Sequence, residues 1–500
     1  RSRRGGAMNA IALSLISHTN AGKTTLARTL LGRDIGEVRD APHVTTEAAR
    51  YALLETPQGD SLVLWDTPGF SDSARLAKRL AQSANPIVWF LAQAWDRFRD
   101  RALYLSQQAV RNVREQADIV LYLVNASEAP ADAGYLAPEL DVLAWIGRPT
   151  FVLLNQTGPP RPRGEEEADE SRWREAVGMR AFVRGVLTFD AFARCWVQEI
   201  VLLRALAPGI PAEKRAGFDR LVVAWEARRA GQFEEAMAAL AAPIAAAARD
   251  RETMPNPPLG ARLREALRSV LSDAPRGDGK QKAARTLADR LDASVRQSTD
   301  RLIAIYGLEG RAAEVVRERL LEHVRSDAPL HEGKAAMVGG VLSGALSGLA
   351  ADLLAGGLTL GAGTLIGAIA GALGGAGIAR GYNVLRDRTE LVIRWDDELL
   401  DSLAASALLR YLAVAHFGRG RGEWTESEYP SFWHDVVRGQ LEAQRSALSQ
   451  IWARRDKPAA ASIDEELHAI LARAARGILD ALYPEASAAA PAGAGGADSG

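Results

Sequence analysis

The sequence predicts an α/β domain, a mainly parallel six-stranded sheet with helices on both faces, followed by a mostly α-helical half. Up to about residue 206, short apolar runs alternate with amphipathic stretches, as in β-α units. From about residue 211 to 325, Ala, Leu, Arg and Glu recur at helical spacing and strand signals vanish. A later block, 335–379, carries Asp352 as its only charged residue and is rich in glycine.

The expected elements of the first domain follow from this alternation. The expected strands are Ala10–Ser17, Tyr51–Glu55, Ser61–Asp66, Ile119–Asn125, Thr150–Asn155 and Val186–Phe189. The expected helices between them are Thr24–Leu31, Ile87–Glu115, Pro138–Trp145 and Phe192–Leu206. The Pro- and Arg-rich run Pro159–Gly164 and the acidic run Glu165–Glu170 predict an exposed loop.

The whole chain divides into five expected parts, separated by changes in composition. They are the α/β domain 1–206, a helical region 207–334, a Gly/Ala-rich apolar helical hairpin 335–379, a second helical region 380–484 and a disordered tail 485–500.

Length, charge and cysteine content limit the function classes. The 500 residues are enough for two or three domains. With 61 basic and 62 acidic residues, the formal net charge is -1, so no global field favours nucleic acid. The single cysteine, Cys195, cannot form an intramolecular disulfide, which favours a reducing, cytoplasmic setting. The apolar run before Ser17 leads into a Gly-Lys-Thr motif, so it indicates a strand and not a signal peptide.

A phosphate-binding loop is predicted at Ser17–Thr24, which matches Gly-x-x-x-x-Gly-Lys-Ser/Thr except that Ser17 replaces the first glycine. It follows an apolar strand and opens a helix, so backbone N–H groups and the helix dipole can hold phosphates. Lys23 is expected to reach the β and γ phosphates, and the Thr24 hydroxyl to bind Mg²⁺. The nucleotide-contacting candidates of this loop are Asn20, Ala21, Gly22, Lys23, Thr24 and Thr25.

A second motif, Asp66-Thr67-Pro68-Gly69, ends another apolar strand, where a phosphate-sensing loop belongs. Asp66 is expected to meet Mg²⁺ through water, and the Gly69 N–H to sense the γ-phosphate. Between the motifs, Thr46 lies in a polar stretch that can act as a mobile switch and offer a hydroxyl to Mg²⁺. The predicted catalytic set is therefore Lys23, Thr46, Asp66 and Gly69.

At these residues the first 200 or so positions resemble the Era and TrmE-like GTPases, whose motifs read Asn-x-Gly-Lys-Ser/Thr and Asp-Thr-Pro-Gly. The resemblance implies a Ras-like P-loop G domain that binds GTP or GDP with Mg²⁺ and hydrolyses GTP. It also implies that Asn20 helps to hold K⁺. Phe70 follows the second motif, so a water-orienting glutamine is missing there, and hydrolysis is expected to be slow without a cation, a dimer or a partner.

The base-specificity motif departs from that family. Era-like proteins carry Asn-Lys-x-Asp after the fifth strand, whereas this chain has Asn155-Gln156-Thr157-Gly158. Asn155 is retained as a nucleotide-binding candidate, but guanine preference follows from the resemblance and not from this motif. Asp190, in the loop after the sixth strand, is interpreted as either a base contact or a helix cap, and we favour the cap.

Glycine recurs every four residues in both arms of 335–379, which predicts two closely packed helices. Two interpretations remain open. The arms can dip into or cross the cytoplasmic membrane, with Lys334 and Arg380 anchoring both ends on the same side, or they can pack as a soluble hairpin. We favour the membrane interpretation. Together with the first domain, this arrangement resembles bacterial GTPases that carry a C-terminal domain of unknown function.

The sequence therefore favours a GTPase switch whose helical half docks on a membrane or on an unidentified protein partner, with a homodimer through the G domain as a further expectation. Three alternatives remain: a non-hydrolysing nucleotide-binding scaffold, an ATPase, and a dynamin-like membrane-acting GTPase. The C-terminal half shows no basic stripe interleaved with aromatic residues, so no nucleic-acid partner is predicted.

Overall fold

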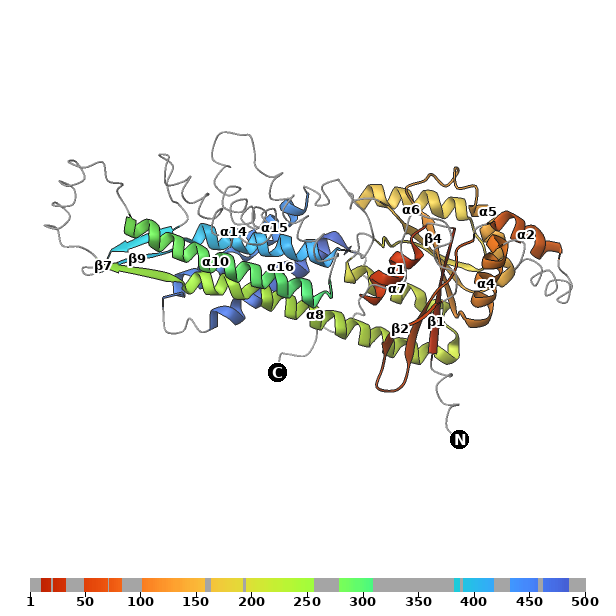
Figure 1. Ribbon diagram of the computed structural model, residues 1–500, viewed down its shortest axis with the longest axis horizontal. Coiled ribbons are helices and arrows are strands. Elements are labelled where there is room, and N and C mark those ends of the chain that lie inside the picture. The colour runs from red at the N-terminus through yellow and green to blue at the C-terminus, as the bar shows by residue number, and fades with distance from the viewer. Residues whose placement is uncertain are drawn as a thin grey trace. The chain divides into compact units, whose positions relative to one another are not determined.

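The computed structural model describes twelve stretches of the chain. They are residues 10–18, 21–32, 49–70, 72–82, 101–157, 163–191, 195–255, 278–308, 382–386, 390–417, 432–456 and 462–484. These residues form two compact units: the first holds the described residues up to Gly231 together with 415–417 and 483–484, and the second holds the rest (Figure 1). The predicted hairpin 335–379 and tail 485–500 lie outside the described residues.

The first unit contains a six-stranded sheet in the order β2-β3-β1-β4-β5-β6. Its strands are β1 (Ala10–Ser17), β2 (Ala49–Glu55), β3 (Ser61–Asp66), β4 (Ile119–Asn125), β5 (Thr150–Asn155) and β6 (Val183–Thr188). All neighbours pair in parallel except β2 and β3, which form an antiparallel hairpin. The predicted α/β fold class is confirmed, and β1, β3, β4 and β5 have the expected bounds, because each is a short apolar run.

Helices cover both faces of this sheet, as the sequence predicts (Figure 1). They are α1 (Lys23–Leu31), α2 (Ser73–Gln82), α4 (Arg101–Gln116), α5 (Leu136–Ile146), α6 (Arg163–Val177), α7 (Trp196–Leu206) and the first part of α8 (Arg215–Arg249). One core cluster joins β1 residues such as Leu13 to α1, α7 and α8, and the other joins Ile16 to α2, α4, α5 and α6. Alternate β-strand residues therefore supply two separate cores.

The acidic run Glu165–Glu170 is not a loop, which corrects the prediction. It lies in the first half of α6, whose first turn carries Glu165 and Glu166. Carboxylates near a helix N-terminus are favourable because they face the positive end of the helix dipole. Glu170 also accepts hydrogen bonds from the backbone N–H (3.0 Å) and Oγ1 (2.7 Å) of Thr188 at the end of β6.

The helix expected at Ile87–Glu115 agrees with α4 (Arg101–Gln116) over its described part. The sequence did not lead us to expect the separate α2 at Ser73–Gln82. Residues 83–100 lie outside the described part of the chain.

The second unit is mostly helical. It contains the later part of α8, α10 (Asp278–Ile305), α14 (Asp397–Ala415), α15 (Phe432–Arg454) and α16 (Ile463–Leu482). Arg410 of α14 donates to Thr299 Oγ1 of α10 at 2.8 Å, and α15 packs against α16. The predicted apolar face of the last helix is buried at Leu467, Ile470, Leu471, Ala474 and Ile478. Among the described residues, no helix combines the length and apolar character that a bilayer crossing requires.

A three-stranded antiparallel sheet in this unit corrects two expectations. It has the order β7-β9-β8, with β7 at Arg251–Pro255, β8 at Tyr382–Arg386 and β9 at Glu390–Trp395. Strand β7 lies within 211–325, where strand signals were missing, and β8 and β9 lie within the region 380–484 expected to be helical. Each strand has only five or six residues, too few for a clear alternation. Strands β7 and β9 also pair across a long sequence separation, with Thr253 opposite Val392, so local patterns carry no sign of the sheet.

A buried ion pair fastens α8 to α7 within the first unit. Glu199 on α7 is 2% exposed and accepts hydrogen bonds from Trp225 Nε1 (2.8 Å) and from Arg229 Nε (2.7 Å) and Nη2 (2.8 Å) on α8. Because the Arg229 guanidinium is also buried, removing either partner would leave the charge of the other buried and uncompensated.

We expect Glu199→Ala to lower the free energy of unfolding by about 3–5 kcal/mol, because it leaves the Arg229 charge buried and unpaired. Denaturant unfolding of the full chain measures the loss. The matched control is Glu226→Ala, which removes the partly exposed pair with Arg204 and should cost about 0–1 kcal/mol. Equal losses for the two variants would contradict the importance of the buried pair.

Candidate functional site

The predicted phosphate-binding loop lies where β1 ends and α1 begins, at the carboxyl edge of the parallel sheet. Ligands bind at this edge in open α/β folds. Gly22 precedes α1 with φ +89°, a left-handed conformation that L residues rarely adopt. A β-carbon at Gly22 would also lie 2.4 Å from Asn155 Nδ2. Both constraints explain why glycine is required at this position.

Lys23 places its ammonium group inside this loop. The residue is 7% exposed, and its Nζ donates to Ser17 Oγ at 2.8 Å and to the His18 carbonyl at 3.5 Å. Burial lowers the pKa of Lys23, whereas the charges of Asp66 and Glu139 oppose that shift. Ser17, which replaces the glycine of the motif, therefore supplies a hydroxyl that holds the lysine in the loop.

Asp66 ends β3 beside the loop. Its Oδ2 accepts a hydrogen bond of 2.8 Å from Thr24 Oγ1, while its Oδ1 is buried and has no hydrogen-bond partner among the described residues. Burial raises the pKa of Asp66, and the Lys23 charge acts in the opposite direction. A hydroxyl and an unsatisfied carboxylate oxygen at one point are hard oxygen ligands, so they fit Mg²⁺.

No group of three or more His, Cys, Asp or Glu side chains suited to a metal occurs in the described ranges.

The loop after Asp66 packs against the phosphate-binding loop. Thr67 Oγ1 donates to the Leu15 carbonyl at 2.5 Å, and the Phe70 N–H donates to the Ser17 carbonyl at 3.0 Å. The Phe70 side chain is fully buried in the core cluster that includes Leu76 of α2. Phe70, the residue after the second motif, therefore has a structural role in the core. Gly69, the expected γ-phosphate sensor, lies between these contacts and is partly buried.

Asn155 joins the phosphate-binding loop to the loop after β6. Its Nδ2 donates to the Ala21 carbonyl at 2.7 Å, and its Oδ1 accepts from the Ala191 N–H at 2.7 Å. Gln156 adopts a left-handed φ of +59°, and its Nε2 lies 3.9 Å from the β-carbon position of Gly22. The first two positions of the eroded motif therefore lie against the phosphate-binding loop.

Asp190 does not cap the following helix, so that expectation is wrong. Helix α7 begins at Trp196, and its N-cap is Cys195. Asp190 instead accepts hydrogen bonds at its Oδ2 from the Thr157 N–H (2.8 Å) and from Thr157 Oγ1 (3.0 Å). The carboxylate thus joins the loop after β6 to the loop after β5.

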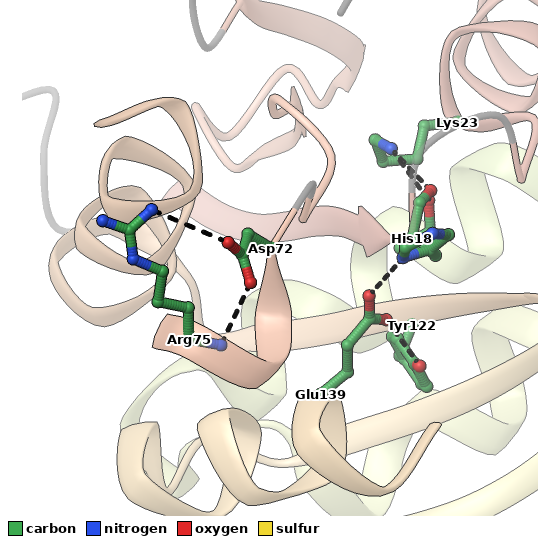
Figure 2. Close-up of polar contacts among 7 residues, drawn as sticks. His18, Lys23, Asp72, Arg75, Tyr122 and Glu139 are labelled. Carbon is green, nitrogen blue, oxygen red and sulfur yellow. Dashed lines mark hydrogen bonds and ion pairs between the residues drawn. The ribbon is translucent and has the colours of Figure 1, made fainter. Parts of the chain in front are cut away.

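The structure also reveals a buried polar chain that the sequence did not lead us to expect, shown in Figure 2. Glu139 of α5 is fully buried, and its two oxygens contact His18 Nδ1 at 2.9 Å and the Tyr122 hydroxyl at 2.7 Å. The ring of Tyr135 stacks on His18 with centroids 4.5 Å apart. An acid inside the apolar run from Leu136 was the available signal. These contacts of Glu139 connect His18 of the phosphate-binding loop to β4 and α5.

Figure 2 also shows Asp72 and Arg75 at the start of α2. Asp72 Oδ1 accepts from the Arg75 N–H at 3.1 Å, and the side chains form an ion pair at 3.9 Å. Both side chains are substantially exposed, so we assign this pair the role of stabilising the helix start.

Some predicted site residues cannot be placed. Asn20, Thr46 and Gly158 lie outside the described residues. The structure does bring together Ala21, Gly22, Lys23, Thr24, Asp66 and Asn155. Thr25 lies in the first turn of α1 and is buried.

Comparison with known proteins agrees with this geometry. Residues 13–156 match the family model described as "50S ribosome-binding GTPase". The fold and the site define the first domain as a P-loop GTPase domain of the Era-like type. Residues 176–484, more than half of the chain, match the model described as "Domain of unknown function (DUF3482)". The chain therefore belongs to the DUF3482 family.

Two curated relatives are similar to the first domain. GTPase Era of Geobacter metallireducens is 28% identical over 145 residues, 29% of this chain and 39% of the relative. GTPase Era of Heliobacterium modesticaldum is 26% identical over 145 residues, 29% of this chain and 38% of the relative. The chain thus spans less than two fifths of the length of each relative.

Solved structures of Era are also similar in part. A variant of Aquifex aeolicus Era bound to GDP.AlF4- is 15% identical with a TM-score of 0.30, over 41% of this chain and 57% of the other. Era in complex with MgGDPNP and nucleotides 1506-1542 of 16S ribosomal RNA is 15% identical with a TM-score of 0.31, over 41% and 58%. These partial matches add nothing to the family assignment.

The raised pKa of Glu139 yields a prediction about pH. Burial favours the neutral carboxyl, so its stabilising contribution is fully present below the ordinary pKa of 4.5 and is lost as pH rises through the raised folded-state pKa. Relative to Glu139→Gln, the wild type should therefore lose free energy of unfolding as pH rises above 4.5. Denaturant midpoints measured at several pH values check this. A constant difference between the two proteins would contradict it.

Proposed function

We propose that the chain is a Mg²⁺-dependent GTP-binding protein that hydrolyses GTP and acts as a nucleotide switch. The observation that carries the proposal is the pairing of Thr24 with Asp66, whose Oδ1 is buried and unsatisfied, next to the confined Lys23 ammonium group. Hydroxyl, carboxylate and ammonium groups meet at the start of a helix at the carboxyl edge of the sheet. This arrangement suits a triphosphate and its metal.

Each predicted site residue has a role in this proposal. Backbone N–H groups of Ala21 to Thr25 hold the phosphates, and Lys23 leaves Ser17 to contact the β and γ phosphates. Thr24 and Asp66 would hold Mg²⁺ with their oxygen atoms. When bound, Mg²⁺ neutralises phosphate charge and orients the oxygens of the reacting group. Gly69 senses the γ-phosphate with its N–H, and Thr46 joins the metal when GTP is bound.

The proposed nucleotide is GTP, with GDP as product. The support is the Era-like family match and the GTPase Era relatives. Asn155 supports the same site by fastening the phosphate-binding loop to Ala191. The tightness of guanine selection depends on residues other than Gly158, since glycine has no side chain to contact a base.

Slow hydrolysis is part of the proposal. The burial of Phe70 in the core means that this position cannot orient the attacking water. A K⁺ ion held by Asn20, a homodimer through the G domain or a protein partner would have to supply the missing transition-state charge. The same burial favours a second candidate, a scaffold that binds GTP without hydrolysing it.

The helical half is proposed to convert the nucleotide state into docking on a cytoplasmic membrane surface or a protein. The support is compositional, because 335–379 is apolar and Gly-rich in an otherwise charged chain. In the dynamin-like alternative, the protein would act on the membrane itself and not only dock on it.

Nucleotide binding is tested with Lys23→Ala in the full-length chain. Isothermal calorimetry with GTP and Mg²⁺ should show saturable binding by the wild type and an affinity lowered at least about 100-fold in the variant, because a charge-assisted phosphate contact is lost. The control is Arg111→Ala, which removes an exposed cation that pairs with Glu115. Unaltered binding by Lys23→Ala, or no binding by the wild type, would refute the proposal.

The hydrolytic step is tested by single-turnover GTP hydrolysis in K⁺ and in Na⁺ buffers of equal ionic strength. We expect the wild type to be about 10-fold or more faster in K⁺, and Asn20→Ala to remove the difference while still binding GTP. Equal rates in both buffers eliminate the K⁺ role. Binding without turnover in either buffer supports the non-hydrolysing scaffold.

A further inference from the structure

A buried carboxyl group from α5 contacts the start of the phosphate-binding loop. Glu139 Oε1 lies 2.9 Å from His18 Nδ1, and Glu139 Oε2 accepts a hydrogen bond of 2.7 Å from the Tyr122 hydroxyl (Figure 2). Glu139 is fully buried, and 121 residues separate it from His18 along the chain. Both carboxyl oxygens are therefore engaged, one with the phosphate-binding loop and the other with β4.

The imidazole ring of His18 is held from a second direction by Tyr135. The two rings are stacked, with centroids 4.5 Å apart and an angle of 11° between their planes. Tyr135 is the residue directly before α5, so the same segment supplies both the stacking ring and the carboxyl group. A buried hydrogen bond and a stacked ring each restrict the imidazole, so α5 fixes the position of residue 18.

The main chain of His18 in turn holds the side chain of Lys23. The His18 carbonyl accepts from Lys23 Nζ at 3.5 Å and also from Ser17 Oγ, which itself accepts from Lys23 Nζ at 2.8 Å. An ammonium group has three N–H donors, so Lys23 can keep the His18 carbonyl and still reach a phosphate. A displacement of His18 would therefore move an acceptor that orients the lysine.

Packing does not explain an acid at position 139. The neighbouring buried residues of α5 are apolar and include Leu136, Leu140 and Leu143. A leucine at position 139 would have a similar volume and would avoid the cost of burying a polar group. The carboxyl group adds what leucine lacks, namely the hydrogen-bonded contact with the phosphate-binding loop.

We propose that Glu139 is a positioning residue for nucleotide binding, which acts through His18 to hold Lys23 where it meets the phosphates. Without the carboxyl group, the start of the loop adopts additional conformations. The apparent affinity then falls in proportion to the fraction of molecules in the binding-competent conformation. This inference rests on the proposed function and deepens it, because it adds a residue of α5 to the groups that determine triphosphate affinity.

The test compares the affinity of full-length wild type, Glu139→Leu and Glu139→Gln for GTP with Mg²⁺, measured by calorimetry at one pH. Glu139→Leu removes both hydrogen bonds and should weaken GTP binding about 10-fold or more. Glu139→Gln should bind GTP within about 3-fold of the wild type, because the amide has a donor and an acceptor, and the hydroxyl and the imidazole can each take either role. Equally weak binding by both variants would contradict the role of the hydrogen bonds.

Tyr122→Phe is the matched control, since it breaks a hydrogen bond to the same buried carboxyl group and leaves the His18 contact in place. It should lower the free energy of unfolding in denaturant, yet change GTP affinity by less than about 3-fold. If Tyr122→Phe weakened GTP binding as much as Glu139→Leu, general destabilisation would account for both losses, and the inference would be overturned.

A double-mutant cycle with His18→Phe tests whether Glu139 acts through His18. The phenyl ring can still stack on Tyr135 but lacks Nδ1. The double variant should bind GTP as Glu139→Leu alone does, whereas losses that multiply would show that the two residues act independently and overturn the inference.

Failure of this inference and failure of the proposed function give different results. A wild type that binds GTP, combined with unchanged affinity in Glu139→Leu, overturns this inference alone. A wild type that binds no triphosphate overturns the proposed function, and this inference with it.

Discussion

The burial of opposite charges at one edge of a parallel sheet is the constraint on which the first domain depends. Lys23 and Asp66 are both nearly inaccessible, and burial alone would neutralise each of them. Their mutual attraction and the hydroxyls of Ser17 and Thr24 offset part of that cost. The cost of removing the Lys23 and Asp66 charges from water is therefore only partly offset within the protein. Such a site is suited to a ligand that brings phosphate charge and a cation at the same time.

The polar groups around this charge pair are held in place by buried hydrogen bonds. Glu139 links His18 of the phosphate-binding loop to Tyr122 of β4, and Asn155 links the other end of the loop to Ala191. Both Glu139 and Asn155 are themselves buried. Buried polar groups with satisfied hydrogen bonds restrict the geometry of a site more than exposed groups do, so His18 and Ala21 are held in place before a ligand arrives.

Departures from the Era-like pattern concern turnover and base selection, while the phosphate end keeps its chemistry. Phe70 belongs to the core and Gly158 has no side chain, yet Lys23, Thr24 and Asp66 meet as a metal and phosphate site requires. In the proposed function, the first domain keeps the groups that phosphate and Mg²⁺ binding require, and hydrolysis depends on an additional cation, a second copy or a partner. This division suits a switch whose lifetime in the GTP state is set by a cation, a second copy or a partner.

The sequence by itself determined the α/β class, four strand bounds and the identity of the phosphate-binding loop, because apolar runs and the glycine-lysine motif act over a few residues. Only the tertiary structure decided how Asp190 is used, since its partner Thr157 belongs to another loop. The same holds for the contact of Glu139 with His18 and for the pairing of β7 with β9. Such contacts join residues far apart in the chain. The sequence around one partner therefore does not reveal which residue the other partner is.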